Sequence, residues 1–245
     1  MIQKLKKIKN FIFGNYSTDV AFRYMPLVSL IKRDGFNNKK ILEVGSGDTG
    51  IAVYLSQDIT GLDVYFDENK IKNLEKVKYE GEIFPFEDNF FSLTISVDSL
   101  EHVLPAKREK FIQEMIRVSR EGIILMVPAG RSSYQHDERL GKYFYQINKK
   151  SDKFINEHLR NGLPEDFEIK DYIEKACIAL GKKGEVVISE KMLNLKFREM
   201  IMYCKISQNI FLSTLYYSFI ILLPSWRLLN FGQCYRSLVY FKIKQ

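Results

Sequence analysis

The residues best suited to bind a ligand lie in ILEVGSGDTG, residues 41–50, where an apolar run ends in three closely spaced glycines. Glycine at Gly45, Gly47 and Gly50 permits a positive φ angle and lets a ligand approach the backbone closely. The spacing also reads as the G-x-G-x-x-G of dinucleotide-binding enzymes. The loop alone therefore predicts an adenosine-containing cofactor and does not select between a nicotinamide dinucleotide and S-adenosylmethionine.

Carboxylates near this loop help to separate the two cofactors. Glu43 lies two residues before the first glycine, where its charge would repel a pyrophosphate and favour the ammonium and sulfonium of S-adenosylmethionine. Asp63 follows at the expected end of a second strand, where it can hold the ribose hydroxyls of either cofactor. The charges favour the methyl donor, and a nicotinamide-dependent oxidoreductase of the Rossmann type is the alternative.

Histidines are the candidates for proton transfer. Methyl transfer from a sulfonium is an in-line displacement, which needs a base only if the acceptor must lose a proton. His102 follows the fourth expected strand and is the first candidate for that base, with capping of the next helix as its alternative role. His158 lies in a helical run that Gly162 and Pro164 end, so we expect it to face the pocket from a lid or to lie on the surface. Neither the histidines nor the three cysteines have metal-ligand spacing, so no metal is expected.

The elements that must position these residues follow from the hydrophobic pattern. From residue 40 onward, short β-branched runs alternate with helical patterns, which is typical of βαβ units and a mostly parallel sheet. Helices are predicted at Gly50–Ser56 and Lys107–Arg120. The predicted strands are Lys40–Val44, Thr60–Val64, Val77–Glu80, Leu93–Val97, Gly122–Val127, Glu185–Glu190 and Ser237–Ile243.

Three segments fall outside this alternation. Residues 1–35 form an N-terminal helical segment that opens with a basic amphipathic helix, ahead of one domain over residues 36–245. Within that domain we expect a helical lid insertion at about 131–164 and an apolar helical insertion at about 193–232. A single membrane crossing there would leave the last strand across the membrane from the sheet that it must join. The apolar segment is therefore expected to be buried core, a cover for an acceptor channel, a dimer interface or an in-plane helix pair on a membrane.

The stretch EGEIFPFEDNFFSLTISVDSLEHV, residues 80–103, resembles the third and fourth motifs of the class I S-adenosylmethionine-dependent methyltransferase superfamily. Phe84-Pro85-Phe86 stands for its L-P-F turn and Leu100-Glu101-His102 matches its L-E-H end. With ILEVGSG and Asp63, the resemblance covers roughly residues 38–128. It implies an α/β fold with a Rossmann-like, seven-stranded, mostly parallel sheet in the order 3-2-1-4-5-7-6, helical lid insertions, and S-adenosylmethionine as cofactor.

The resemblance also implies a cofactor site. The glycine loop would contact the methionine moiety, Glu80 or else Glu82 the adenine, and Val97–Asp98 would line the cofactor. This sequence departs from the family at Thr49, where the third glycine is usual, and at Ser92, where an aspartate is usual. The expected cofactor-binding residues are Glu43, Gly45, Ser46, Gly47, Asp63, Val64, Glu80 and Asp98.

Charge and motif content bear on the partner. The net charge of +7 suits an anionic membrane surface, an acidic substrate or nucleic acid, and equally a lysine-rich proteome. No N/D-P-P-Y/F loop and no Pro-Cys nucleophile is present, so nucleic acid is not expected, and an RNA methyltransferase would have to show steeply salt-dependent binding.

We therefore expect an enzyme that O-methylates a small-molecule, glycan or lipid-linked acceptor. A non-catalytic module that keeps the fold is the alternative, and the oligomeric state is left open. The cysteine pattern and the short N-terminal apolar run predict a cytoplasmic protein, with peripheral attachment to the inner face of the membrane as a further possibility.

Overall fold

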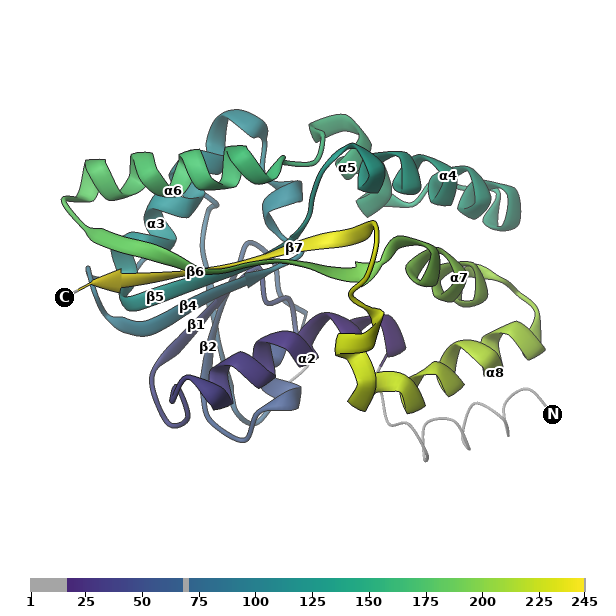
Figure 1. Ribbon diagram of the computed structural model, residues 1–245, viewed down its shortest axis with the longest axis horizontal. Coiled ribbons are helices and arrows are strands. Elements are labelled where there is room, and N and C mark those ends of the chain that lie inside the picture. The colour runs from purple at the N-terminus through teal and green to yellow at the C-terminus, as the bar shows by residue number, and fades with distance from the viewer. Residues whose placement is uncertain (1–16, 68–70, 245) are drawn as a thin grey trace.

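The computed structural model describes residues 17–67 and 71–244 (Figure 1). The amphipathic helix predicted near the start of residues 1–35 lies outside the described residues. In the described part, seven strands form one sheet in the order β3-β2-β1-β4-β5-β7-β6. Strands β1 to β5 are parallel, and β7 runs antiparallel to both β5 and β6. The predicted fold class and strand order are confirmed.

The strands lie close to their predicted positions, with one clear shift. The third strand is three residues earlier than expected, because only its first residue, Leu74, is buried and its other side chains give no apolar alternation. Its end at Lys78 leaves Glu80 outside the sheet. The strands are β1 Ile41–Val44, β2 Ile59–Asp63, β3 Leu74–Lys78, β4 Phe91–Val97, β5 Ser119–Pro128, β6 Lys183–Asn194 and β7 Cys234–Lys244.

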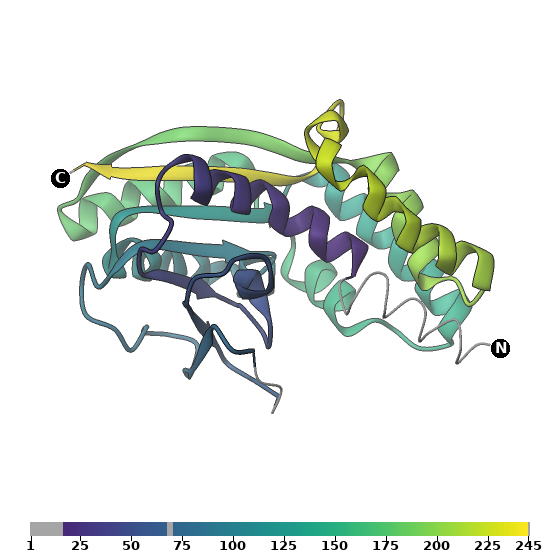
Figure 2. The ribbon, with the colours of Figure 1, turned by 90° about the horizontal axis from the view of Figure 1, so that it is seen from below.

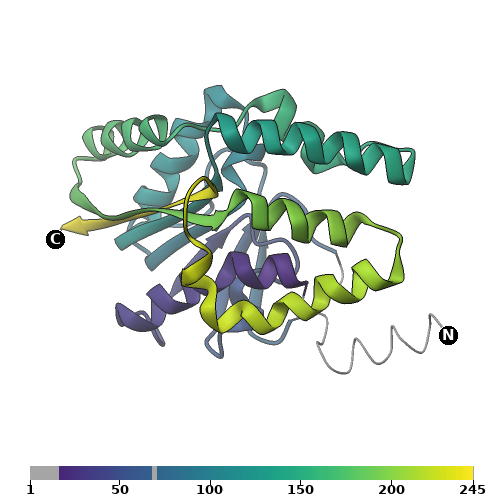
Figure 3. The same ribbon diagram turned by 45° about the vertical axis from the view of Figure 1, so that its right-hand side comes forward.

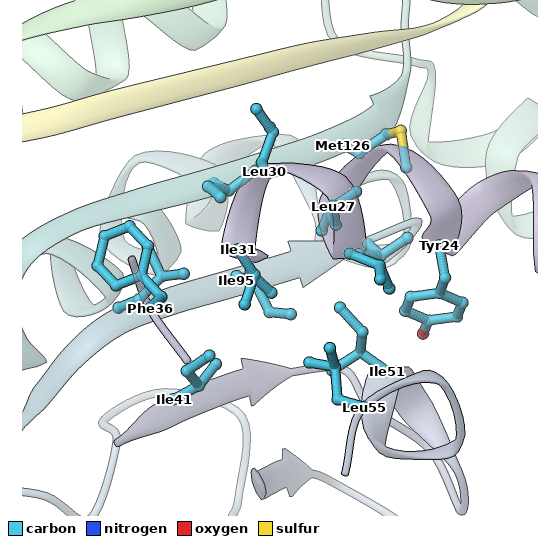
Figure 4. Close-up of a cluster of buried hydrophobic side chains, with 14 of the residues drawn as sticks. Tyr24, Leu27, Leu30, Ile31, Phe36, Ile41, Ile51, Leu55, Ile95 and Met126 are labelled. Carbon is cyan, nitrogen blue, oxygen red and sulfur yellow. The ribbon is translucent and has the colours of Figure 1, made fainter. Parts of the chain in front are cut away.

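One face of the sheet is covered by α2 (Thr18–Arg33) and the short 3-10 helix η1 (Gly50–Tyr54), as Figure 2 shows from below. Side chains of a strand alternate between faces, so Ile41 packs on this side together with Leu27 and Ile31 of α2 (Figure 4). Glu43, two residues after Ile41, points to the same side. This register decides the environment of Glu43.

Helices α3 (Pro105–Val118) and α6 (Asp166–Leu180) cover the opposite face. Leu42 and Val44 of β1 pack there against Met115 and Ile116 of α3 and Ile169 of α6. Both faces of the central strands are thus buried, as expected for a parallel sheet with helices on each side.

The helix predicted at Gly50–Ser56 is only a single short turn, η1. The side-chain amide of Asn73 donates to the carbonyl oxygens of Ala52, Leu55 and Gln57 at 2.9–3.0 Å. These bonds take carbonyls that a longer helix would need, so the chain turns directly into β2.

The remaining helices gather at the carboxyl ends of the parallel strands. The predicted lid segment contains α4 (Arg131–Asn148) and α5 (Lys153–Asn161), and the predicted apolar insertion contains α7 (Leu195–Ile206), α8 (Ile210–Ser218) and the 3-10 stretch η3 (Phe219–Leu229). Figure 3 shows α4, α7 and α8 projecting from the same end of the sheet. The short helix η2 (Leu100–His102) follows β4 at this end.

The later part of the apolar insertion, Ile210–Leu229, is mostly exposed. By length and composition Ile210–Leu229 could cross a membrane, and only 6% of its most apolar window is buried. In contrast to α7, which buries four residues, η3 buries none. Of the four roles expected for the apolar segment, buried core is therefore wrong for Ile210–Leu229, and the other three stay predictions.

Candidate functional site

A cavity of about 1250 Å³ lies at the carboxyl ends of β1, β2 and β4. Its wall runs from the glycine loop after β1, past Asp63 and Asp98, to residues of α4, α5 and α7. Ligands of open α/β sheets bind at this edge. Pockets for one small ligand usually hold roughly 300–1,000 Å³, so this cavity has room for a nucleotide cofactor and an acceptor together.

The glycines of the loop are required by close contacts. Gly45 has φ +76°, and a Cβ there would collide with the side chain of Ser99. Gly50 has φ +46°, and a Cβ there would collide with the carboxylate of Glu43. The third glycine therefore stands at position 50, directly over Glu43, and the departure at Thr49 has a local structural reason.

Glu43 supports the loop from beneath. It has no exposed surface, and its carboxylate accepts hydrogen bonds from the Tyr24 hydroxyl at 2.8 Å and from the Ile51 N–H at 2.6 Å. Burial raises the pKa of Glu43 to about 7. Glu43 is not part of the cavity wall, so the prediction that its charge acts directly on the cofactor is corrected: strand register turns the side chain toward α2.

Asp63 joins the loop to the end of β2. Its Oδ2 accepts from the N–H of Gly47 at 2.8 Å, and its Oδ1 accepts from the N–H of Val64 at 2.7 Å. Asp63 lines the cavity together with Gly45, Ser46, Gly47 and Val64. Glycine main-chain groups and a carboxylate beside a roomy cavity suit the methionine and ribose parts of S-adenosylmethionine, so the residues present fit this cofactor.

Asp98 also lines the cavity, but its carboxylate is already paired. The guanidinium of Arg236 on β7 holds it in a two-pronged contact of 2.7 and 2.5 Å, and Nε of Arg23 lies 3.1 Å away. Burial raises the pKa of Asp98, but Arg236 and Arg23 outweigh burial and lower it to about 2. Asp98 is therefore a fixed anion between two cations.

Glu80 does not lie where the predicted contact with adenine requires it. Its side chain is exposed and is not part of the cavity wall, although Tyr79 and Gly81 on either side are. Glu82 is paired with Lys107 at 2.9 Å. The prediction placed Glu80 at the end of the third strand, and the earlier end of β3 at Lys78 removes the reason for that position.

The departure at Ser92 lies far from the cavity along its strand. Ser92 is the second residue of β4, where its hydroxyl accepts a hydrogen bond from Arg120 at 2.8 Å. The cavity lies at the other end of β4, after Val97. The missing aspartate therefore leaves the cavity wall unchanged.

The two histidines predicted to act in catalysis come together at the other end of the cavity. The ring centroids of His102 on η2 and His158 on α5 lie 4.9 Å apart. Nδ1 of His102 lies 2.8 Å from the Glu157 carboxylate, and Nδ1 of His158 lies 2.7 Å from the Asp137 carboxylate. Each ring is thus held by a carboxylate on one nitrogen, which leaves the other nitrogen for a ligand.

Glu101 completes this group. It is fully buried, and neither carboxylate oxygen is hydrogen-bonded to another residue. Burial raises its pKa to about 8, and the negative charge of Asp98 adds to this shift. Burial lowers the pKa of His158, but the nearby carboxylates of Asp137 and Glu101 raise it by more, so the net shift is upward. The pKa of His102 is lowered, because burial and the charge of His158 both disfavour its protonated form.

Sequence reasoning missed the residues that surround these histidines. The Tyr235 hydroxyl donates to Asp137 at 2.7 Å, and the guanidinium of Arg198 lies 3.4 Å from the centre of the Tyr235 ring. These residues come from α4, α7 and β7, so no local spacing joins them. One signal was available, because Arg236 is a charged residue within the apolar run of the last strand.

Comparison with known proteins agrees with this geometry. Residues 42–127 match a family model described as a methyltransferase domain. A protein described as a sarcosine dimethylglycine methyltransferase from Galdieria sulphuraria is 13% identical, with a TM-score of 0.52, over 88% of this chain and 83% of that one.

Two further solved structures are similar. A protein described as a methyltransferase of an antibiotic biosynthesis pathway from Anabaena variabilis is 15% identical, with a TM-score of 0.52, over 87% of this chain and 96% of that one. The PH0226 protein of Pyrococcus horikoshii is 15% identical, with a TM-score of 0.51, over 91% of this chain and 90% of that one. At these identities the likeness shows the fold. The matching domain model and the sheet order together identify residues 42–127 as a methyltransferase domain in a chain with the class I methyltransferase fold, and its cofactor is S-adenosylmethionine.

Proposed function

We propose that this methyltransferase methylates a hydroxyl oxygen of an acceptor that binds beside Glu101, His102 and His158. One observation carries the proposal: a single cavity joins the glycine loop and Asp63 to these three side chains. The acceptor end is lined by groups that can hold a hydroxyl, whereas the cofactor end offers main-chain groups and one carboxylate.

The bound cofactor supplies an electrophilic methyl group. The task of the protein is then to hold the acceptor oxygen in line with it and to exclude water, which can supply much of the rate enhancement of such a reaction. His102 and His158 are fixed by Glu157 and Asp137, and their remaining ring nitrogens can hold the acceptor hydroxyl directly or through an ion that binds it. This arrangement supports the two histidines as the residues that position the acceptor.

The first experiment is a calorimetric titration of the full-length protein with S-adenosylmethionine, with NAD as the competing ligand. We expect saturable binding of the methyl donor that NAD does not displace. Asp63→Ala should abolish or strongly weaken binding, because it removes both the ribose contact and the acceptor of the Gly47 N–H. A folded protein that binds NAD and not the methyl donor would overturn the proposal.

Acceptors can then be screened by mass spectrometry for a gain of one methyl group. Hydroxyl-bearing small molecules, glycans and lipid-linked glycans form the three sets. Glu109→Gln, an exposed carboxylate on α3 outside the cavity wall, serves as the unaffected control. Methylation of nitrogen and not oxygen in an accepted compound would contradict the proposed reaction.

Among acceptors, the surface of the apolar insertion favours a lipid-linked molecule. We call this surface the α8–η3 face. Met202, Lys205 and Ile206 of α7 line the cavity, and α7 leads through three residues into α8. The face carries no charged residue between Lys205 and Arg227, and such an apolar strip with flanking cations suits an anionic membrane surface. Its exposed large side chains are Ile210, Phe211, Leu212, Leu215, Ile221, Leu222 and Leu228.

Flotation with anionic lipid vesicles tests this attachment. We expect the full chain to co-float, and replacement of Phe211, Ile221 and Leu228 by serine to remove binding, because these side chains are 80%, 75% and 77% exposed and their loss should not disturb the fold. The matched control replaces Phe167 and Ile178 of α6, which are 71% and 81% exposed, by serine. Equal flotation of the two variants would rule out the α8–η3 face as the membrane contact.

A further inference from the structure

We propose that Glu101, His102 and His158 bind one divalent transition-metal ion of the Zn²⁺ type at the acceptor end of the cavity. The binding site stands on its own geometry, and only its role in methyl transfer rests on the proposed function. Spacing along the chain did not predict this site, because two ligands lie on η2 and the third lies more than fifty residues later on α5.

The ligand atoms are already gathered. Each of the three residues offers one nitrogen or oxygen atom, and these atoms lie within 4.8 Å of one another. Nε2 of His158 lies 3.8 Å from Oε1 of Glu101. All three residues line the cavity, so an ion could reach them from solvent.

Two of the three residues have buried ligand atoms without a hydrogen-bond partner. Neither oxygen of Glu101 is hydrogen-bonded to another residue, and Nε2 of His158 has no hydrogen-bond partner. Buried carboxylates are costly unless they are paired, protonated or bound to a metal. Among the described residues, no arginine or lysine forms an ion pair with Glu101. The charge of Arg23 lowers the pKa of Glu101, but the guanidinium of Arg23 is paired with Asp98. A divalent cation would satisfy Glu101 and His158 together.

The outer contacts of the histidines are those typical of metal sites. A metal-bound imidazole usually donates its other N–H to a carboxylate or carbonyl, which fixes the ring and its tautomer. Nδ1 of His158 lies 2.7 Å from Asp137, and Nδ1 of His102 lies 2.8 Å from Glu157. Asp137 is itself held by the Tyr235 hydroxyl. Both rings therefore have a supported Nδ1 and an Nε2 free to coordinate.

The chemistry of the donor set selects the kind of ion. Two imidazole nitrogens and one carboxylate oxygen suit Zn²⁺, Co²⁺ or Fe²⁺, whereas Mg²⁺ and Ca²⁺ prefer all-oxygen sites. Three protein ligands leave coordination positions on the cavity side. An acceptor hydroxyl can occupy one of them.

Such an ion would promote O-methylation without any redox step. Coordination lowers the pKa of a bound hydroxyl, so its proton is released to solvent water. The acceptor oxygen then forms a bond to the methyl carbon as the carbon–sulfur bond breaks. The products are the methyl ether, S-adenosylhomocysteine and one proton, and charge and atoms balance.

Cobalt binding tests the site directly. Untagged full-length protein is stripped with a chelator, dialysed and titrated with Co²⁺, whose visible absorption reports an ordered nitrogen–oxygen site. We expect one Co²⁺ per chain and loss of the signal on addition of one equivalent of Zn²⁺. Removal of the outer contact in Asp137→Asn should weaken Co²⁺ binding by about 10–100-fold, and Glu101→Gln or His158→Asn should weaken it at least as much.

Controls separate ligand loss from misfolding and from failure of the proposed function. Glu109→Gln should bind Co²⁺ as the wild type does, and each variant is checked for S-adenosylmethionine binding as a measure of folding. If the buried variants do not fold, His102→Asn replaces them, since its side chain is 27% exposed. Wild-type protein that binds the methyl donor but no stoichiometric Co²⁺ would overturn the metal site alone. Co²⁺ binding that persists in a folded Glu101→Gln or His102→Asn variant would overturn it as well.

Discussion

At the cofactor end, the cavity wall comes from the glycine loop after β1 and from the segments that follow β2 and β3. At the acceptor end it comes from η2, α4, α5, α7 and β7. The first end depends on backbone conformation and on glycines with no room for a side chain. The second depends on buried charges that hold one another, such as Asp98 and Arg236. A local motif can therefore encode the cofactor end, while only the assembled fold creates the acceptor end.

The largest effect is expected where the buried charges are broken. Arg236→Met leaves Asp98 buried with only Arg23 beside it, and loss of one partner of a buried ion pair typically costs about 3–5 kcal/mol in the free energy of unfolding. Urea denaturation measures the change. Lys107→Met, which breaks the exposed pair with Glu82, should cost less than about 1 kcal/mol. Similar costs for the two variants would contradict the distinction between buried and exposed charges.

The glycine loop should respond next most strongly. Gly50→Ala imposes an unfavourable positive φ, which costs about 1–2 kcal/mol, and forces a methyl group against Glu43, which adds about 1–3 kcal/mol. We expect a lower free energy of unfolding and weaker S-adenosylmethionine binding by calorimetry. Gly35 also has a positive φ, but a Cβ there would meet no atom within 4 Å. Gly35→Ala should therefore lose only the free energy due to the φ angle and should bind S-adenosylmethionine normally.

Burial of Glu43 predicts a pH dependence of stability. Its folded-state pKa of about 7 lies above the ordinary value of 4.5, so the folded protein prefers the protonated form. The contribution of Glu43 to the free energy of unfolding is fully present below pH 4.5 and is lost as the pH rises through about 7. The total change is up to about 3 kcal/mol. Glu43→Gln should flatten that part of the curve in chemical denaturation between pH 4 and 8. A curve identical to that of the wild type would show that Glu43 is charged at low cost.

The smallest effect is expected at Glu80. Because its side chain is exposed and outside the cavity wall, Glu80→Ala should change the affinity for S-adenosylmethionine by less than about threefold in calorimetry. Asp63→Ala in the same assay is the matched comparison. A large loss of affinity in Glu80→Ala would restore the adenine contact that the resemblance implies and would mean that the loop after β3 rearranges on binding.

The sequence alone determined the fold and the cofactor end. Alternating apolar runs, three glycines after a strand and Asp63 at the end of the next are local features, and local features are read directly from residue order. The alternation predicted the mostly parallel sheet, and the resemblance to class I methyltransferases implied the strand order. Gly45, Ser46, Gly47, Asp63 and Val64 all line the cavity, and their binding of the cofactor stays a prediction.

Only the tertiary structure decided the rest. Strand register turned Glu43 away from the cavity and the early end of β3 left Glu80 outside it, and neither is visible in a motif because a one-residue change of register reverses the face of a side chain. The pairing of Asp98 with Arg236 joins residues far apart in the chain, and so does the meeting of His102, Glu101 and His158. Contacts of this kind arise when separate helices close over one end of a sheet, so they depend on packing and not on spacing.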